Sequence, residues 1–303
     1  MAVIQSVQSG SETIVAGDGL AITITLGSSV TLAQSYLVCT WRDADSSTRE
    51  RRHLFTEELS STQITLTRNQ SSFAASVTCE WYVYEFDSSV TVQRGIFTPS
   101  TISDSQTITA VNAGSTFVTA SFSSTADAML RWTVDLASTT SINFDSVSSV
   151  TADEIAWQAI EFGSGDAAVQ LFTGQISIGS TSKAIAVTSL TVADAFVGSE
   201  FGFSNSTFAP AARSRDSCLI DSSTQITVKK DATNTGSAYD YAIYVVEMLD
   251  GTTVQSGTAT IADAATGTTA TITALTNGGM TQGSTGGNRQ ADCRPSSARR
   301  ASS

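Results

Sequence analysis

The sequence predicts an all-β protein built from tandem antiparallel β-sandwiches and followed by a flexible C-terminal tail. Three observations support this fold class. Apolar and polar residues alternate with the period of two expected of half-buried strands. Helical periodicity is weak throughout, and the same short landmarks recur along the chain in the same order.

The first landmark is the tetrad Val-Gln-x-Gly. It occurs at residues 7–10, 92–95 and 254–257, with a looser form at 169–174. Successive Gln residues of the landmark are 85, 77 and 85 positions apart. A strand-like segment follows each tetrad, at residues 22–25, 107–111, 184–187 and 271–275. Turn clusters rich in Gly, Asn and Asp separate the segments, which favours short antiparallel strands.

Two further landmarks complete the repeat. One is the segment around Ile64, Ile142 and Ile226, and the other ends in Glu85, Glu161 and Glu247. The distance from each Ile to its Glu is 21, 19 and 21 residues. A unit of about 80 residues with several short strands has the size of a small immunoglobulin-like sandwich.

The repeat predicts the following organisation. Residues 1–95 form the first sandwich and residues 96–176 the second. Residues 177–280 form the third sandwich together with an extra half-unit that starts near Val254. Residues 281–303 form a Gly-rich linker and a basic arm. Because unpaired strands are sticky, the half-unit is expected to pair with the third sandwich, with a second copy or with another protein.

The landmark that ends in Glu85, Glu161 and Glu247 suggests which side chains are buried and which are not catalytic. Trp81, Trp157 and the equivalent Ile243 are expected at matching buried sites. The recurrent Glu of this landmark stands at the same strand position in every unit, whereas glycoside hydrolysis needs two carboxyl groups in different roles. A structural role is therefore favoured. The tyrosines at 82, 84, 239, 241 and 244 are expected to pack between sheet faces rather than to stack on sugars.

Composition narrows the functional classes. The chain has 303 residues and a formal net charge of -12, which argues against binding nucleic acid or anionic lipid. No apolar run approaches the length of a membrane helix. The single His and the absence of nucleotide-binding or nucleophile-elbow motifs leave no candidate catalytic, cofactor-binding or metal-binding residues, so we expect no enzyme activity and no cofactor. The oxygen-rich stretch 43–47 lacks the Gly and distal Glu of an EF-hand loop.

The four cysteines do not form a disulfide framework. Cys39 and Cys79 lie in predicted strands of one unit, so a bridge between them is geometrically open. We favour two buried free thiols that act as small apolar side chains.

Two basic segments are the candidate interaction sites. Arg49, Arg51, Arg52 and His53 form a charged insertion in the first unit and are a candidate contact loop. Arg289, Arg294, Arg299 and Arg300 give the acidic chain a cationic arm, which suits docking on an acidic neighbour or forms a solvated end. Arg131 and Arg215 each precede the repeat Ile by 11 residues, which favours a structural ion pair.

With this repeat in view, the chain resembles the tandem β-sandwich structural proteins of tailed bacteriophages, such as capsid decoration proteins, head fibres and tail fibres. The tetrad, the Trp-x-x-x-Glu-Phe segment, the Ser- and Thr-rich strands and a start without a secretory signal carry the resemblance, over about residues 1–280. The resemblance implies a non-enzymatic protein of the virion, made in the host cytoplasm and exposed on the particle. Its expected partners are other virion proteins and further copies of itself; a module that binds a host-surface glycan or receptor is the alternative.

Overall fold

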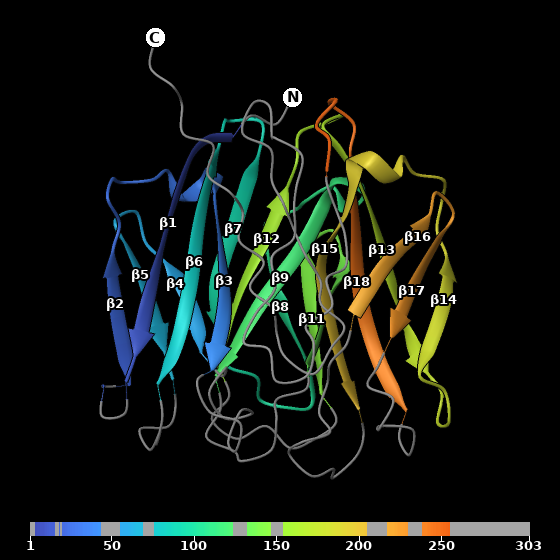
Figure 1. The fold of residues 1–303 in the computed structure, drawn as a ribbon, viewed down its shortest axis with the longest axis horizontal. Coiled ribbons are helices and arrows are strands. Elements are labelled where there is room, and N and C mark those ends of the chain that lie inside the picture. The colour runs from blue at the N-terminus through green and yellow to red at the C-terminus, as the bar shows by residue number, and fades with distance from the viewer. Residues whose placement is uncertain are drawn as a thin grey trace, which may run out of the picture.

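The computed structural model describes residues 4–15, 18, 20–43, 55–68, 76–123, 132–146, 154–204, 217–229 and 238–254. Within these ranges the chain is all-β apart from three single-turn 3-10 helices, which confirms the all-β part of the prediction (Figure 1). No helix in these ranges has the length and apolar character needed to cross a membrane. The helices are η1 (Leu32–Gln34), η3 (Ala113–Ser115) and η4 (Val192–Asp194).

The described strands form three groups of six, and every strand pairs only within its own group. The first group contains β1 (Ile4–Ile14), β2 (Ala21–Thr25), β3 (Ser35–Asp43), β4 (Thr56–Leu59), β5 (Gln63–Thr67) and β6 (Val77–Phe86). The second contains β7 (Thr91–Phe97), β8 (Ser103–Thr107), β9 (Thr116–Ser123), β10 (Trp132–Ser138), β11 (Ser141–Ser146) and β12 (Glu154–Glu161). The third contains β13 (Ala167–Ile176), β14 (Ser182–Ala186), β15 (Ala195–Ser204), β16 (Ser217–Ser222), β17 (Gln225–Lys229) and β18 (Tyr239–Met248).

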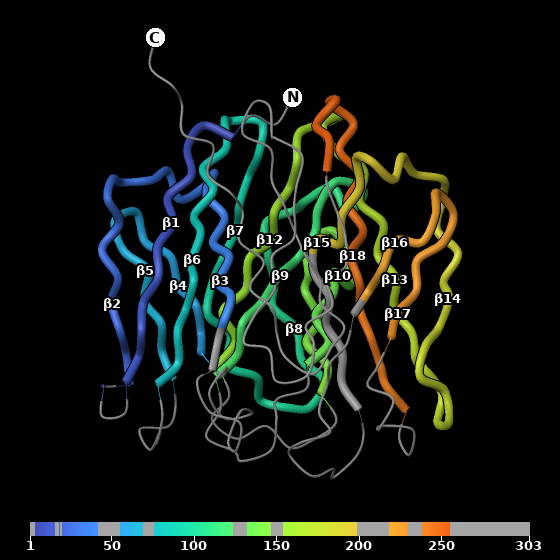
Figure 2. Tube along the Cα trace, in the orientation of Figure 1, coloured from blue at the N-terminus to red at the C-terminus, as the bar shows by residue number. Residues whose placement is uncertain are grey.

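Each group has the same topology. Its first, sixth and third strands form one antiparallel sheet, with orders β1-β6-β3, β7-β12-β9 and β13-β18-β15. Its second, fifth and fourth strands form another, with orders β2-β5-β4, β8-β11-β10 and β14-β17-β16. The 3-10 helix of each group connects its second strand to its third. Figure 2 shows the second group lying between the first and the third.

Sheet pairing places both divisions between groups earlier in the chain than the boundaries that the repeat predicted. The divisions fall between Phe86 and Thr91 and between Glu161 and Ala167. The predicted boundary at residue 95 lies inside β7, and residue 176 is the last residue of β13. The reason is that the Val-Gln-x-Gly tetrad belongs to the first strand of each group and does not end the preceding one.

The two outer groups each have a hydrophobic core that draws on both of their sheets. In the first group, Leu37, Trp41 and Trp81 from one sheet share a cluster with Ile64 and Leu66 from the other. The alternation in β5 explains this placement, because Ile64 and Leu66 are both fully buried and lie two residues apart. In the third group, the corresponding cluster contains Ile226, Val228, Tyr241, Ile243 and Val245.

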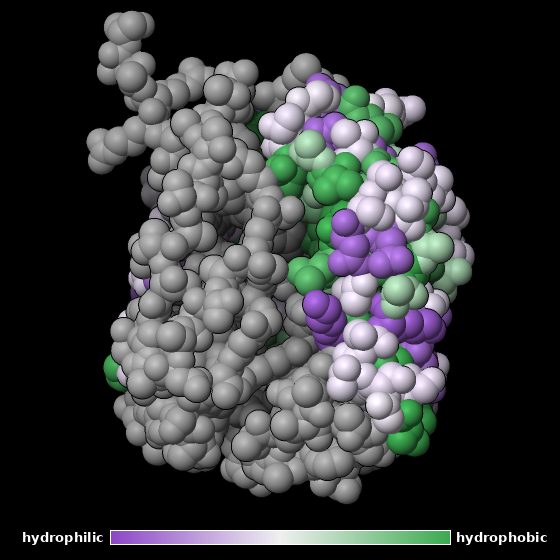
Figure 3. Space-filling model, turned by 45° about the vertical axis from the view of Figure 1, so that its right-hand side comes forward, coloured by the Kyte–Doolittle hydropathy of each residue, from purple (hydrophilic) through white to green (hydrophobic). Residues whose placement is uncertain are grey.

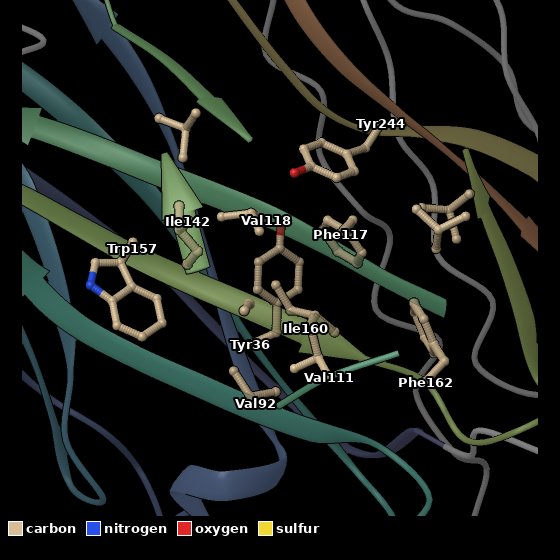
Figure 4. Packing of buried hydrophobic residues seen from close by; sticks show 14 of the residues in the cluster. Tyr36, Val92, Val111, Phe117, Val118, Ile142, Trp157, Ile160, Phe162 and Tyr244 are labelled. Atoms are coloured by element: carbon tan, nitrogen blue, oxygen red, sulfur yellow. The ribbon is translucent and has the colours of Figure 1, made fainter. Parts of the chain in front are cut away.

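The second group shares its core with its neighbours. Its buried residues, among them Ile142 and Trp157, join a cluster that includes Tyr36 of the first group and Tyr244 of the third (Figure 4). We call this set the central apolar cluster. Both faces of the β6 and β18 strands are therefore covered, as the large side chains on both faces of the β6 segment predicted.

Candidate functional site

The Gln of the repeated tetrad fastens a loop of its own group. Its side-chain amide donates to one backbone carbonyl and its side-chain oxygen accepts from the N–H of the same residue, which lies a few positions beyond the second strand. The distances are 2.9 and 3.1 Å for Gln8 with Ser28, 2.9 and 2.8 Å for Gln93 with Thr109, and 3.2 and 2.8 Å for Gln170 with Thr188. Repetition of this clamp in three groups marks the Gln as a structural residue.

The recurrent Glu has an equally regular partner. In each group it accepts a hydrogen bond from the backbone N–H of the residue that precedes the 3-10 helix. The distances are 2.8 Å from Thr31 to Glu85, 2.7 Å from Asn112 to Glu161 and 2.6 Å from Thr191 to Glu247. The hydrogen bond from Thr31 is the main cause that lowers the pKa of Glu85. The structural role expected for these carboxylates is confirmed.

The Gly of the tetrad makes room for an aromatic ring on the neighbouring strand. A Cβ atom at Gly10 would lie 2.6 Å from the ring of Trp81, and one at Gly95 would lie 3.0 Å from Trp157. The burial predicted for Trp81, Trp157 and Ile243 is confirmed, with exposed fractions of 7%, 6% and 0%. In the third group the ring over the glycine belongs to Tyr241, because Gly174 stands two residues further from its Gln.

The five tyrosines considered as sugar-stacking candidates are all buried, with at most 6% of their surface exposed. Tyr82 and Tyr84 lie in the central apolar cluster, where Tyr84 stacks on Tyr36 at 6.4 Å between ring centres. Tyr239 and Tyr241 lie in the core of the third group. None presents a ring face to solvent, so the packing interpretation is confirmed.

Polar contacts join neighbouring groups at both junctions, through the third strand of the first group and the fourth strand of the second. Gln158 in β12 donates to the carbonyl of Leu37 at 2.9 Å and accepts from its N–H at 3.1 Å, and both residues are buried. At the next junction the N–H of Leu136 donates to the hydroxyl of Tyr244 at 2.8 Å. In both cases a backbone edge of one group meets a side chain from the sixth strand of the next group. The junctions are therefore specific and not merely apolar.

Aromatic rings meet at the centre of the three groups. Tyr36, Phe117 and Phe196 occupy the same position near the start of the third strand of their respective groups. The ring of Phe117 contacts Tyr36 edge-on at 5.7 Å and Phe196 edge-on at 6.5 Å. Edge-to-face pairs at these separations are favourable beyond the area that they bury. The same kind of edge-to-face contact thus joins the first group to the second and the second group to the third.

A compact set of titratable side chains lies inside the first group beside the first junction. The carboxylate of Glu57 accepts a hydrogen bond from the indole N–H of Trp41 at 2.8 Å and another from the Cys39 thiol. Burial raises the pKa of Glu57 to about 7, although both hydrogen bonds act to lower it. The backbone N–H of Glu57 donates to the hydroxyl of Ser121 in the second group at 2.9 Å.

Burial also lowers the reactivity expected of the Cys39 thiol in this set. Cys39 and Cys79 are free, as we expected, and Cys79 is fully buried. Burial raises the pKa of the Cys39 thiol well above its usual range, and the neighbouring Cys79 adds to the shift. Because the thiolate is the nucleophile and the metal ligand, a thiol held in its protonated form is poorly suited to either role. In the described part of the chain no group of three or more His, Cys, Asp or Glu residues is arranged to hold a metal ion.

Two carboxylates occupy equivalent positions on the fourth strands, opposite the neighbouring groups. Burial raises the pKa of Asp135 in β10 to about 6, and the nearby charge of Asp145 contributes. Burial also raises the pKa of Glu58 in β4, with a contribution from Glu154 of the second group. Both junctions therefore carry an acid that favours its neutral form more than a free side chain does.

The basic residues that the sequence singled out lie outside the described residues. This applies to the contact-loop candidates Arg49, Arg51, Arg52 and His53 and to the arm residues Arg289, Arg294, Arg299 and Arg300. It applies also to Arg131 and Arg215 and to residues 44–47 of the oxygen-rich stretch. The extra half-unit from Val254 is described only at its first residue. These assignments stay predictions.

Sequence reasoning missed the junction residues Gln158 and Arg94. The guanidinium of Arg94, the third residue of its tetrad, donates to the carbonyl of Leu32 at 2.7 Å and to that of Ser35. Burial lowers the pKa of Arg94 to about 10. Neither residue recurs at its position in the other groups, so a search for repeats passes over both. The chain matches no protein-family model, and no curated protein shows significant sequence similarity to it.

Proposed function

We propose that this chain is a non-enzymatic structural protein of a bacteriophage virion, exposed on the particle as a capsid decoration or fibre protein. In this proposal each group is an immunoglobulin-like sandwich, and the region after Met280 is a flexible tail. The protein assembles with other virion proteins and with copies of itself through sandwich contacts and its C-terminal region. It needs no cofactor, and it does not bind nucleic acid or enter a membrane.

The observation that carries the proposal is the use of the recurrent polar residues. In the three described groups the recurrent Gln and Glu hold loops of their own group, and the tetrad Gly accommodates an aromatic ring. Residues that recur for a catalytic or binding purpose would instead converge on a solvent-facing site. A repeat whose polar side chains all serve its own architecture is suited to a structural part.

The junctions give a second line of support. The central apolar cluster runs through all three groups, and hydrogen bonds that are buried at the first junction and partly buried at the second join the groups. Such a body transmits force as one piece because neighbouring groups are locked by packing and not tethered by a linker. A particle-bound protein that must survive outside a cell benefits from this rigidity.

A receptor- or glycan-binding module is the second candidate, and one observation favours it. Strands β3, β9 and β15 occupy the same place in their groups and all end toward the lower end of the molecule in Figure 1. The segments that follow them in sequence, 44–55, 124–131 and 205–216, differ widely in composition, and the first carries Arg49, Arg51, Arg52 and His53. Variable segments on a conserved scaffold are a common arrangement for recognition.

Labelled antibodies raised against the whole chain and applied to purified particles test the proposal. Electron microscopy should show label on intact particles at fixed sites of the head or tail. Particles without label, combined with the chain appearing only in the soluble fraction of the lysate, would overturn it. Loss of host attachment after Arg49, Arg51 and Arg52 are replaced by Ser, with particle labelling unchanged, would favour the receptor-binding role.

A further inference from the structure

The first strand of a group packs against the 3-10 helix of the group before it. Strand β7 lies against η1 and β13 lies against η3. At the first of these contacts Arg94 donates hydrogen bonds to the carbonyls of Leu32 and Ser35. We call the 3-10 helix of a group together with its third strand the flank of that group. The third strand is an edge strand in every group.

The exposed fraction of the tetrad Val differs between strands that pack on a flank and the strand that does not. Val92 and Val169, whose strands follow a flank, are 5% and 8% exposed and belong to the central apolar cluster. Val7 stands at the same position of the first group, and its strand follows no flank among the described residues. It is 41% exposed. The tetrad Val is therefore buried at both of these junctions and exposed in the first group, and Val254 is partly buried.

The flank of the third group begins to receive a strand in the same way. After β18 the N–H of Thr252 donates to the side chain of Asp250 at 3.0 Å, as the N–H of Ser89 donates to Asp87 at 3.0 Å after β6. Val254 follows Met248 by six residues, and Val92 follows Phe86 by six. The N–H of Val254 then donates to the carbonyl of Ala193 in η4 at 2.6 Å.

Residues 254–257 repeat the tetrad as Val-Gln-Ser-Gly. The turn, the spacing, the tetrad and the contact with η4 all continue the relation that joins the first group to the second. We propose that residues 254–261 of the same chain bind to the flank of the third group, η4 and β15, as a fourth first strand. The first two junctions supply the geometry, and Val254 supplies the point of entry.

The consequence concerns how copies of the protein can meet. Without this segment, the flank of the third group would be open to the first sheet of a second copy, and repetition of that contact would build an open filament. Occupation by residues 254–261 closes this route. Among the described residues of the third group, the exposed large apolar side chains are Ile178, Val192 and Leu249. Figure 3 shows apolar patches interspersed with polar ones over the described part of one face. The inference holds whether or not the protein belongs to a virion.

Paired cysteines test the inference with a matched control inside the same chain. Ser256 and Arg94 are the third residues of their tetrads, and Val192 and Leu32 are the first residues of η4 and η1. Val192 and Leu32 are equally exposed, at 38% and 37%, so thiols placed there are equally accessible. The test variant is Val192→Cys with Ser256→Cys, and the control is Leu32→Cys with Arg94→Cys, both in a Cys293→Ser background and treated with a short bismaleimide.

We expect both variants to form a cross-link within one chain, identified by peptide mass spectrometry and by migration as a monomer on a denaturing gel. Single-cysteine variants exclude linkage to the native thiols. A control that links while the test pair does not, or a test pair that links two chains, overturns the inference. Hydrogen exchange of the unmodified protein is a second test that does not depend on cross-linking. We expect peptide 254–261 to exchange at least tenfold more slowly than an unfolded chain, as peptide 91–97 should. Exchange of peptide 254–261 at the rate of an unfolded chain refutes the proposal.

Discussion

Replacement of Gln158 by Leu should show how much one buried clamp contributes to the junction between the first two groups. Leu has a similar volume, so the packing is kept while both hydrogen bonds to Leu37 are lost. Gln158 is only 8% exposed and Leu37 is 2% exposed, so water cannot replace the lost partner. A buried backbone group left without a hydrogen bond costs about 1–3 kcal/mol, and two groups are affected here. We therefore expect a loss of about 2–6 kcal/mol in the free energy of unfolding.

Gln93→Leu is the matched control. Gln93 also forms two hydrogen bonds to one backbone residue, at 2.9 and 2.8 Å, but the clamp is exposed to solvent. Water can satisfy Thr109 after the change, so the expected loss is about 1 kcal/mol or less. Urea unfolding followed by tryptophan fluorescence measures both variants. Equal losses for the two would refute the argument that burial of the unpaired backbone groups sets the cost.

Three further predictions follow from packing and charge. Gly95→Ala should cost about 1–3 kcal/mol in a urea titration, because its Cβ would meet the ring of Trp157, whereas Gly27→Ala, with its nearest atom at 3.6 Å, should cost less than half as much. Trp157→Ala should cost about 3–5 kcal/mol, and a variant that melts like the parent would place this ring on the surface. Burial raises the pKa of Glu57 to about 7 and that of Asp135 to about 6. The folded protein thus holds these protons more tightly than the unfolded chain does. The contribution of these two groups to stability is therefore full below about pH 4, the range of the unfolded pKa values, and is lost as the pH rises through about 6 and 7. Glu57→Gln and Asp135→Asn should each flatten this part of the pH profile, and a profile identical to that of the parent would count against the assignment.

The all-β class and the position of the repeat residues could be predicted from the sequence because both depend on local patterns. Alternation identified β5 and β6, and recurrence at one strand position marked Glu85 as structural before its partner Thr31 was known. The partner itself was not predictable. It lies 54 residues away in a segment with no landmark, and only the pairing of β3 with β6 brings the two together.

The group divisions and the junctions could not be derived from spacing. A repeat fixes the length of a unit but not the residue at which the unit begins, so spacing alone places the boundary after the tetrad at 92–95, which lies in the first strand of the second group. The contact between Gln158 and Leu37 spans 121 residues and occurs once. A single long-range pair leaves no periodic signal, and its side chain has the same polar character as many exposed residues of the chain.

The first group has a core made of its own residues, whereas the second group shares its core with its neighbours, and this difference has a consequence for synthesis on the ribosome. The first group has an apolar cluster made only of its own residues, so it can fold as soon as β6 has emerged. The second group buries Phe117 and Ile142 in a cluster that also needs Tyr244 and Val246 of the third. Its apolar surface therefore stays partly uncovered while the 87 residues from the end of β12 at Glu161 to the end of β18 at Met248 are translated. During that interval the nascent chain is most open to chaperones and to aggregation, and slow translation of β13 to β18 should lower the soluble yield more than slow translation of β1 to β6.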